Sequence, residues 1–205
     1  MSLFEDTYKT ITASAEGQFS DRGSKFIAYA YPLRDEAEVK ELVAALKAQH
    51  PKARHHCWAY RLTRDRSVFR INDDGEPSGT AGRPILNSLL SADVTNVLLV
   101  VVRYFGGTLL GVPGLIKAYK SAAEDALQAA EVVELTVNDI YNITFPYAQM
   151  NEVMRVVKAE NVEVLKQEFD NHCTMELGIR QTQVEQVLSR LAKVEGVAAD
   201  FLRTV

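Results

Sequence analysis

The sequence is poor in cysteine and has no long apolar run. Its two cysteines, Cys57 and Cys173, belong to no Cys-x-x-Cys pair, which argues against a disulfide framework and a zinc ribbon. No apolar stretch approaches the ~20 residues that a membrane-spanning helix needs. The first residues lack the basic and then apolar pattern of a signal peptide. We therefore expect a cytoplasmic protein without a cofactor.

An excess of positive charge is also missing. The 205 residues carry a net charge of −4, so the molecule as a whole is not a general binder of polyanions. Contact with a nucleic acid would need a local basic patch. We expect such a patch where the folded first half brings together Arg61, Arg83, Arg103, Lys117 and Lys120.

The standard nucleotide-binding motifs are absent. Gly106 and Gly111 have the glycine spacing of a Walker loop, but Val112-Pro113 stands where the motif needs Lys-Ser or Lys-Thr. The phosphate-binding lysine and the hydroxyl that holds magnesium are thus missing, and no Gly-x-Gly-x-x-Gly occurs. These gaps argue against ATP or NAD binding through a standard motif.

Two glycine-rich segments, residues 73–84 and 103–115, dominate what is present. Clustered glycine suggests backbone shapes that other residues cannot adopt, and loops on a rigid scaffold often bind ligands. The alternative is a pair of irregular surface loops. The two segments hold seven of the eleven glycines: Gly75, Gly79, Gly82, Gly106, Gly107, Gly111 and Gly114.

The second glycine-rich segment is suited to an anion. It leaves an apolar strand-like run, residues 97–102, and opens a helix, and no acidic residue occurs between Asp93 and Glu124. Backbone N–H groups would then lie at the positive end of the helix dipole, next to cations and aromatic rings. The predicted nucleic-acid or phosphate-binding residues are Arg61, Arg83, Arg103, Tyr104, Phe105, Gly106, Gly107, Gly111, Gly114, Lys117 and Lys120.

Two catalytic interpretations of the first glycine-rich segment remain open. His55 and Cys57 share a strand face and could join nearby carboxylates around a metal. A structural zinc site needs four ligands, however, and we predict no metal site. A hydroxyl with a histidine and a carboxylate could form a nucleophilic triad, although Gly-x-Ser-x-Gly is absent. The residues of this alternative enzyme site are His56, Asp74, Glu76, Ser78 and Thr80.

Hydrophobic periodicity predicts a mixed first half. It indicates a helix from Asp35 to about His50, a short helix that Thr80 caps, and a buried strand followed by a helix that Pro113 opens. Apolar residues on both faces favour a central position for that strand. The other predicted strands are residues 8–15 and 25–33, joined by a turn at 21–23, and a hairpin of residues 56–62 and 68–71.

The second half predicts a separate domain. Its order of elements is β-α-β-β-α-β, which is typical of a ferredoxin-like fold, with a tight turn at Asp170-Asn171 between its middle strands. The polar stretch from Glu134 to Asp139 is the expected boundary. We therefore predict an α+β protein with domains at residues 1–134 and 139–205.

Several long motifs then match a known family. They are His56-Cys-Trp-Ala-Tyr60, the run from Asp73 to Leu86, Val100 to Thr108, and Gly111-Val-Pro-Gly-Leu115, with Ser24-Lys-Phe-Ile27 upstream. Over about residues 1–130 the sequence resembles the IMPACT/YigZ family. Pro113 departs from it, because many relatives would have glycine there.

The resemblance implies a fold and a function. The first domain should have the left-handed β-α-β fold of domain four of elongation factor G, and the second should resemble domain five. Both are found on proteins that touch ribosomal RNA. Eukaryotic members regulate a stress kinase through an additional amino-terminal domain, which this sequence lacks, so that pathway is not carried over.

We therefore predict a non-catalytic protein that binds RNA or the ribosome and acts in translation or its regulation under stress. An enzyme for a small phosphorylated or peptide substrate is the first alternative. A protein-interaction module, with a partner in translation control, is the second.

Overall fold

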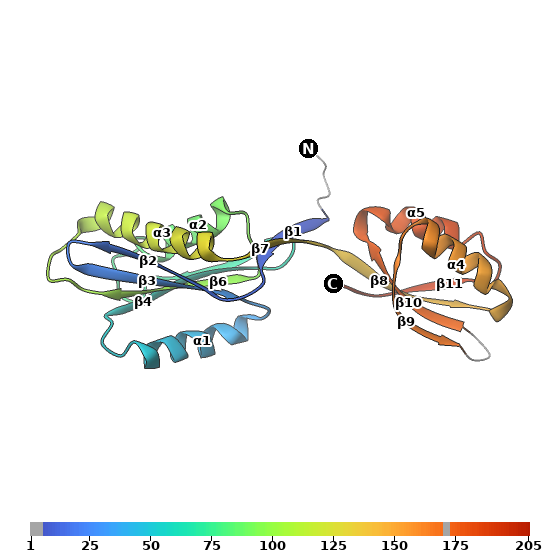
Figure 1. Cartoon of the computed structure of the whole chain (residues 1–205), viewed down its shortest axis with the longest axis horizontal. Helices are drawn as coiled ribbons and strands as arrows, with labels where there is room; N and C mark the ends of the chain where they lie inside the picture. The colour runs from blue at the N-terminus through green and yellow to red at the C-terminus, as the bar shows by residue number, and fades with distance from the viewer. Residues whose placement is uncertain (1–5, 170–172) are drawn as a thin grey trace. The chain divides into compact units, whose positions relative to one another are not determined.

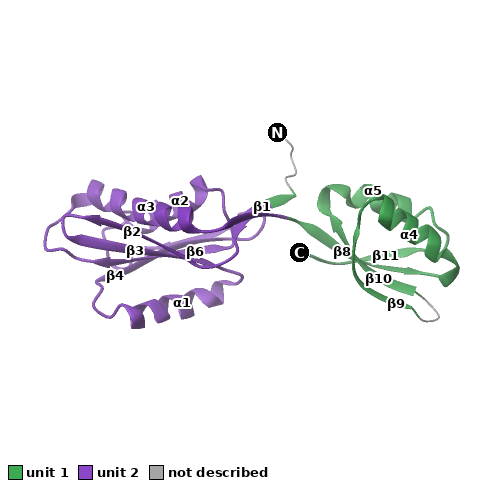
Figure 2. Cartoon of the chain, viewed as in Figure 1, with its two compact units in different colours: residues 1–7, 136–205 green, residues 8–135 purple. Residues whose placement is uncertain are grey.

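A computed structural model describes residues 6–169 and 173–205 of the chain. The predicted turn at Asp170-Asn171 lies outside the described residues. The chain forms two compact units, one of residues 8–135 and one of residues 136–205 with Asp6 and Thr7 (Figure 2). The division falls inside the polar stretch 134–139, where the backbone is in β-strands rather than in an irregular linker.

The first unit is a five-stranded sheet with helices on both faces. Every neighbouring pair of its strands is antiparallel, and the order is β2-β3-β6-β4-β5. Helix α1 covers one face, and α2 and α3 cover the other (Figure 1). The strands are β2 (Ala15–Asp21), β3 (Ser24–Pro32), β4 (His55–Leu62), β5 (Val68–Asn72) and β6 (Val97–Tyr104). The helices are α1 (Glu36–Gln49), α2 (Gly82–Ser91) and α3 (Gly111–Ala129), and β1 (Thr7–Ile11) pairs separately with β7 (Val132–Thr136).

Strand β6 lies at the centre of this unit, as its apolar sequence predicted. All of its residues from Val97 to Arg103 are buried. Its side chains alternate between two cores, so that Leu99 packs with the α2 and α3 side and Val100 packs with the α1 side. Helix α1 begins where predicted, because Asp35 and Glu38 form a reciprocal capping box.

One predicted strand was correct only in its first half. Residues 8–11 lie in β1, residues 12–14 form a loop, and the five-stranded sheet begins at β2, which was not predicted. In β2 only Gly17 is buried, and an added Cβ there would lie 2.1 Å from the backbone nitrogen of Ala126 in α3. The residue of β2 that lies closest to α3 is therefore a glycine, which carries no hydrophobic signal.

The second unit confirms the ferredoxin-like order. Its strands run β11-β8-β10-β9, all pairs are antiparallel, and its two helices pack with the sheet around one core (Figure 1). The two-domain α+β fold predicted from the sequence is thus confirmed. The elements are β8 (Asn138–Phe145), α4 (Met150–Ala159), β9 (Glu163–Phe169), β10 (Cys173–Arg180), α5 (Val184–Leu191) and β11 (Ala198–Thr204). None of the helices in the described ranges combines the length and the hydropathy that crossing a membrane requires.

A buried carboxylate in this second unit should make its stability depend on pH. Asp6 accepts hydrogen bonds from Nε and Nη2 of Arg180, at 2.6 and 2.9 Å, and another from Thr182. The hydrogen bond from Arg180 is the main reason why the pKa of Asp6 lies below its ordinary value of 3.8. A lowered pKa gives a stabilisation that is complete above the unfolded value and is lost as the pH falls through the folded one.

We expect Asp6→Asn to remove that dependence. The variant should be less stable than the wild type at pH 7, and the difference should shrink as the pH falls below 3.8. Urea denaturation of the second unit, followed from pH 7 to pH 2, measures both curves. Parallel curves over this range would contradict the assignment.

Candidate binding site at the two glycine-rich loops

The first glycine-rich loop is built around the carboxylate of Asp73. This side chain accepts hydrogen bonds from the backbone N–H groups of Gly79, Ala81 and Gly82, at 2.9, 3.1 and 2.7 Å. The last two groups belong to the beginning of α2, where a negative charge also complements the helix dipole. Thr80 was predicted to cap this helix, and that prediction was wrong. Its hydroxyl donates to the carbonyl of Pro77 instead, at 2.6 Å.

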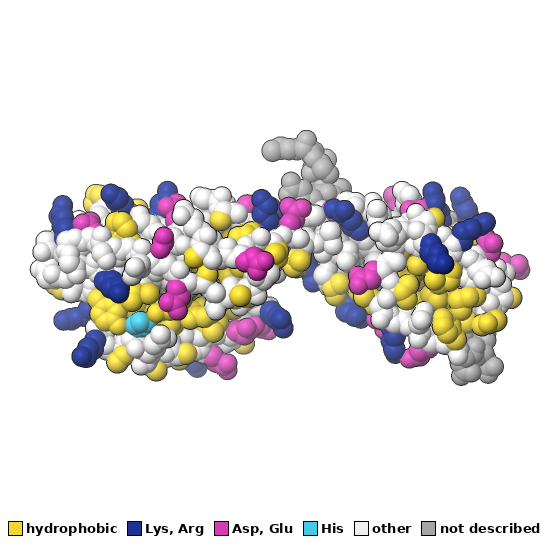
Figure 3. Space-filling model, viewed as in Figure 1, with side chains coloured by type: hydrophobic (Ala, Val, Ile, Leu, Met, Phe, Trp, Pro, Cys, Tyr) yellow, Lys and Arg dark blue, Asp and Glu magenta, His cyan; other side chains and the backbone are white. Residues whose placement is uncertain are grey.

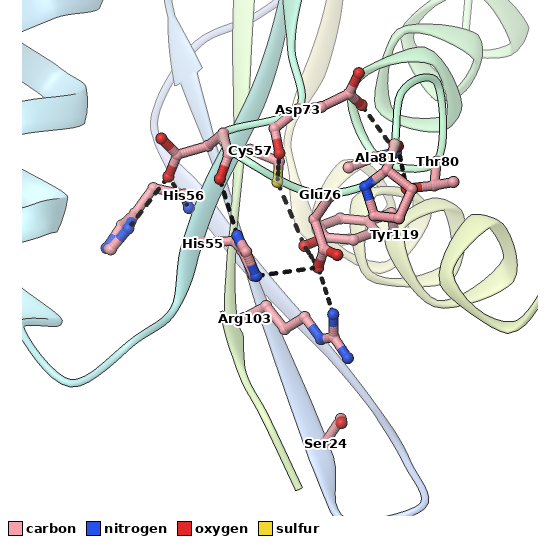
Figure 4. A network of polar contacts seen from close by, with 12 residues as sticks. Ser24, His55, His56, Cys57, Asp73, Glu76, Thr80, Ala81, Arg103 and Tyr119 are labelled. Atoms are coloured by element: carbon pink, nitrogen blue, oxygen red, sulfur yellow. Dashed lines mark hydrogen bonds and ion pairs between the residues drawn. The ribbon is translucent and has the colours of Figure 1, made fainter. Parts of the chain in front are cut away.

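Glu76 is the centre of a buried polar network in the same loop. Its Oε1 atom accepts from Nη1 of Arg103 at 2.5 Å and from the hydroxyl of Tyr119 at 2.8 Å. Nε2 of His55 lies 3.8 Å from the same oxygen. Figure 4 shows these side chains converging from β4, β6 and α3 on the loop. Only 9% of Glu76 and 6% of Arg103 is exposed, so the two charges compensate each other in the interior.

The network continues to the thiol of Cys57. This thiol lies 3.3 Å from the hydroxyl of Tyr119 and 3.0 Å from the carbonyl of Asp73. Burial raises the pKa of Cys57, and it raises the pKa of Tyr119 as well. Both groups therefore stay protonated, and Cys57 is an inert thiol rather than a nucleophile.

Asp74 is bonded to the neighbouring strand and to α1. Its Oδ2 atom accepts from the backbone N–H of His56 at 2.7 Å, and its Oδ1 atom lies 3.3 Å from Nζ of Lys47. The backbone carbonyl of Asp74 lies 2.8 Å from Nδ1 of His55. Burial lowers the pKa of His56, so that its ring is neutral at pH 7.

A groove of about 500 Å³ lies between the two glycine-rich loops. Its ionisable groups come from the loop 73–82, from β4 and from the end of β6, and its apolar groups come mainly from the second loop and the beginning of α3. This is a size typical of ligand pockets. The lining residues are Arg54, His55, Glu76, Pro77, Arg103, Phe105, Leu109, Leu110, Gly111, Val112 and Leu115.

The structure contradicts two members of the predicted basic patch. Arg103 is buried and paired with Glu76, so it contributes no exposed charge to a surface patch. His55 of β4 lies opposite Arg103 in the sheet. Arg61 is six positions further along β4, and at ~3.3 Å per residue this separation is about 20 Å. There its guanidinium bonds Asp93 and the carbonyl of Val94. The error arose because strand register, which sets both positions, was unknown.

The three other predicted cations are exposed on helices. Arg83 lies in the first turn of α2, and Lys117 and Lys120 lie on α3. Lys120 also pairs with Glu124, one turn further along the helix. On the face drawn in Figure 3, lysines and arginines are dispersed among acidic side chains. Of the five cations predicted for the patch, the three that remain exposed therefore lie on α2 and α3.

The aromatic pair of the second loop divides into two roles. Tyr104 is half-buried, and its hydroxyl lies 2.8 Å from Nδ1 of His50, so it braces β6 against the end of α1. Phe105 is 45% exposed, and the guanidinium carbon of Arg103 lies 5.6 Å from its ring centroid. Of these two residues, Phe105 is the one that offers a ring face to a partner.

The glycines of the second loop also differ in role. An added Cβ at Gly106 would lie 2.0 Å from the carbonyl carbon of Gly23, whereas one at Gly107 would meet nothing within 4 Å. Gly107 and Gly111 have φ values of +86° and +71°, which favour glycine. Gly114 is held close to Leu110. Gly106 therefore anchors the loop, and Gly107 forms its open bend.

The groups of the alternative enzyme site are not joined into a Ser-His-Asp triad within the described ranges. Ser78 is exposed, and within the described ranges no hydrogen bond joins its hydroxyl to a histidine. Asp74 and Glu76 are engaged with Lys47, His56, Arg103 and Tyr119 as above. No cluster of three or more His, Cys, Asp and Glu side chains that could hold a metal occurs within residues 6–169 and 173–205.

Sequence reasoning missed Tyr119 and Arg54 as residues of this site. Tyr119 is one of the buried residues of α3, but its hydroxyl was given no role in the prediction. A buried tyrosine usually needs a hydrogen-bond partner, and this signal could have drawn attention to Glu76. Arg54 gave no such signal, because its place at the groove depends on the register of β4.

The fold and the site together define a class of protein. It has an α/β domain with two glycine-rich loops around a buried Glu–Arg pair, followed by a ferredoxin-like domain. Residues 22–127 match the family model of the Impact N-terminal domain. The chain belongs to the IMPACT family.

Individual relatives agree with this assignment. An IMPACT family member of Haemophilus influenzae is 34% identical over 172 residues, which cover 83% of this chain and 84% of the relative. The IMPACT family member YigZ of Escherichia coli is 32% identical over 155 residues, which cover 75% and 76%. A solved crystal structure of a hypothetical protein is 26% identical, with a TM-score of 0.69 over 98% of this chain and 99% of the other.

Proposed function

We propose that this protein is a non-catalytic cytoplasmic factor that binds the ribosome through RNA and acts in translation. The observation that carries the proposal is the second glycine-rich loop. Leu110 precedes α3 without a side-chain cap, and the first turn of the helix contains no acidic residue. The free N–H groups and the positive end of the dipole are therefore open to a phosphate.

The surroundings of this loop favour a single-stranded or looped RNA. Phe105 offers a ring for base stacking, which is a sequence-tolerant contact. Lys117 and Lys120 stand on the exposed side of α3, where they can neutralise phosphates. The resemblance to domains four and five of elongation factor G, which touch ribosomal RNA, supports the same partner.

Co-sedimentation with ribosomes tests the proposal. At low salt the protein should pellet with ribosomes, and log K should fall with log salt by roughly 0.7 for each phosphate contacted. Lys117→Ala should lower this slope by about one contact. Phe105→Ala should weaken binding by ~1–3 kcal/mol, the usual value of one stacked base.

Matched controls come from parts of the same unit that lie away from the second glycine-rich loop. Lys40 is an exposed cation on α1, and Phe69 is a 52% exposed ring on β5. Lys40→Ala and Phe69→Ala should leave both the affinity and the salt slope unchanged. If the wild type fails to pellet at low salt, or if the control variants lose as much binding as the loop variants, ribosome binding through this loop is wrong.

A further inference from the structure

The groove between the two glycine-rich loops has a chemical character that ribosome binding does not require. One part of it is apolar, formed by Pro77, Phe105, Leu109, Leu110, Val112 and Leu115. The other part holds the Glu76–Arg103 pair together with His55 and Arg54. An apolar pocket with a few convergent charged groups is the usual form of a small-molecule site.

Arg103 uses only part of its hydrogen-bonding capacity. Its side chain bonds Glu76 through Nη1 alone, and its Nε has no hydrogen-bond partner in the described part of the chain. The rings of Phe26 and Phe105 lie 5.5 and 5.6 Å from the guanidinium carbon. A buried donor without a partner costs free energy, and an arginine fork is suited to a planar carboxylate.

The balance of charge in the groove is positive. Arg103 and Glu76 cancel each other, which leaves the exposed Arg54 and the beginning of α3 at Gly111. A helix N-terminus favours an anion. The carboxylate of Glu76 lies beside the same guanidinium and opposes a dianion such as phosphate more strongly than a monoanion.

We propose that this groove binds a small organic monocarboxylate whose body is apolar. The carboxylate bonds the free edge of Arg103 beside Arg54, and the positive end of the α3 dipole favours its charge. The body displaces water from Leu109, Val112 and Leu115. Two sources share this chemistry, namely a free apolar carboxylic acid and the carboxy-terminal residue of a peptide.

Titration of the full-length protein by isothermal calorimetry separates these possibilities. N-acetyl-leucine is the free acid, and N-acetyl-leucinamide is its uncharged match. A tripeptide that ends in leucine, with a free carboxylate or as the amide, represents a peptide terminus. Each acid should bind at least tenfold more tightly than its amide, and the better of the two acids identifies the source.

Two pairs of substitutions locate the binding. Val112→Glu places a carboxylate on the groove wall, whereas Ile116→Glu places one on an exposed position of α3 that does not line the groove. Arg54→Ala removes a groove cation, and Lys52→Ala removes an exposed cation nearby. The first member of each pair should weaken acid binding at least fivefold, and the second should not change it. All four positions are at the surface, and a melting curve checks that each variant is folded.

Three outcomes would overturn the proposal: no heat from either acid at 10 mM ligand, equal binding of acid and amide, or equal effects within each pair of variants. None of them bears on ribosome co-sedimentation, which is measured without these ligands. Conversely, Lys117→Ala should weaken ribosome binding without changing the affinity for the acids, because Lys117 does not line the groove.

Discussion

Replacement of Glu76 by glutamine should destabilise the first unit by about 3–5 kcal/mol, because it removes one partner of a buried ion pair and leaves the other charge uncompensated. Arg103 remains charged in the interior, since an arginine is not deprotonated in proteins, and it is only 6% exposed. The hydroxyl of Tyr119 loses its carboxylate acceptor at the same time. Few single substitutions in this unit should cost more.

Trp58 makes this measurement specific to the first unit. It is the only tryptophan of the chain, and it lies on β4, so its fluorescence during urea denaturation reports unfolding of residues 8–135. Glu124→Gln is the matched control, because its carboxylate pairs with Lys120 on the exposed surface of α3. That variant should lose less than about 0.5 kcal/mol. If both variants lose the same small amount, the buried pair does not support the fold.

Gly17→Ala should produce the second large effect, a loss of about 3 kcal/mol or more. The new Cβ would lie 2.1 Å from the nitrogen and 2.7 Å from the Cα of Ala126. The clash involves the backbone of α3, so no side-chain rotation relieves it, and the helix must move away from β2. Overpacking of this kind costs 1–3 kcal/mol, and more where the neighbour is rigid.

Gly178→Ala is the control for this substitution. Gly178 is also buried in a β-strand, but an added Cβ there would meet its nearest atoms at 3.6 Å, which is an ordinary contact distance. This variant should change the stability of the second unit by less than about 1 kcal/mol. Denaturation curves followed by circular dichroism, with Trp58 fluorescence for the first unit, give both values. An equal effect of the two substitutions would contradict the close packing of β2 on α3.

The parts of the fold that were predicted correctly are those with a strong hydrophobic period. Strand β6 is apolar on both faces and proved to be central. Helix α3 buries Leu115, Tyr119 and Ala122, which follow each other at helical spacing. Strand β2 was missed because its buried residue is Gly17, whose role is to let α3 approach.

The site was harder to predict because its contacts join distant parts of the chain. The sequence offered Asp73, Asp74 and Glu76 as three acids in one turn, and nothing local distinguished them. In the structure, Asp73 binds backbone N–H groups, Asp74 binds β4, and Glu76 alone turns inward to Arg103. Which acid meets the arginine depends on strand register and on the path of the loop, and these are tertiary properties.

The central position of β6 also determines when the protein can fold during synthesis. Its two neighbours, β3 and β4, both precede it in the chain and pair with it rather than with each other. Until residue 104 has left the ribosome, these two strands have no common partner, and the apolar faces of both cores stay open. The β2-β3 and β4-β5 pairs can form earlier, but they are joined into one sheet only after β6 is available.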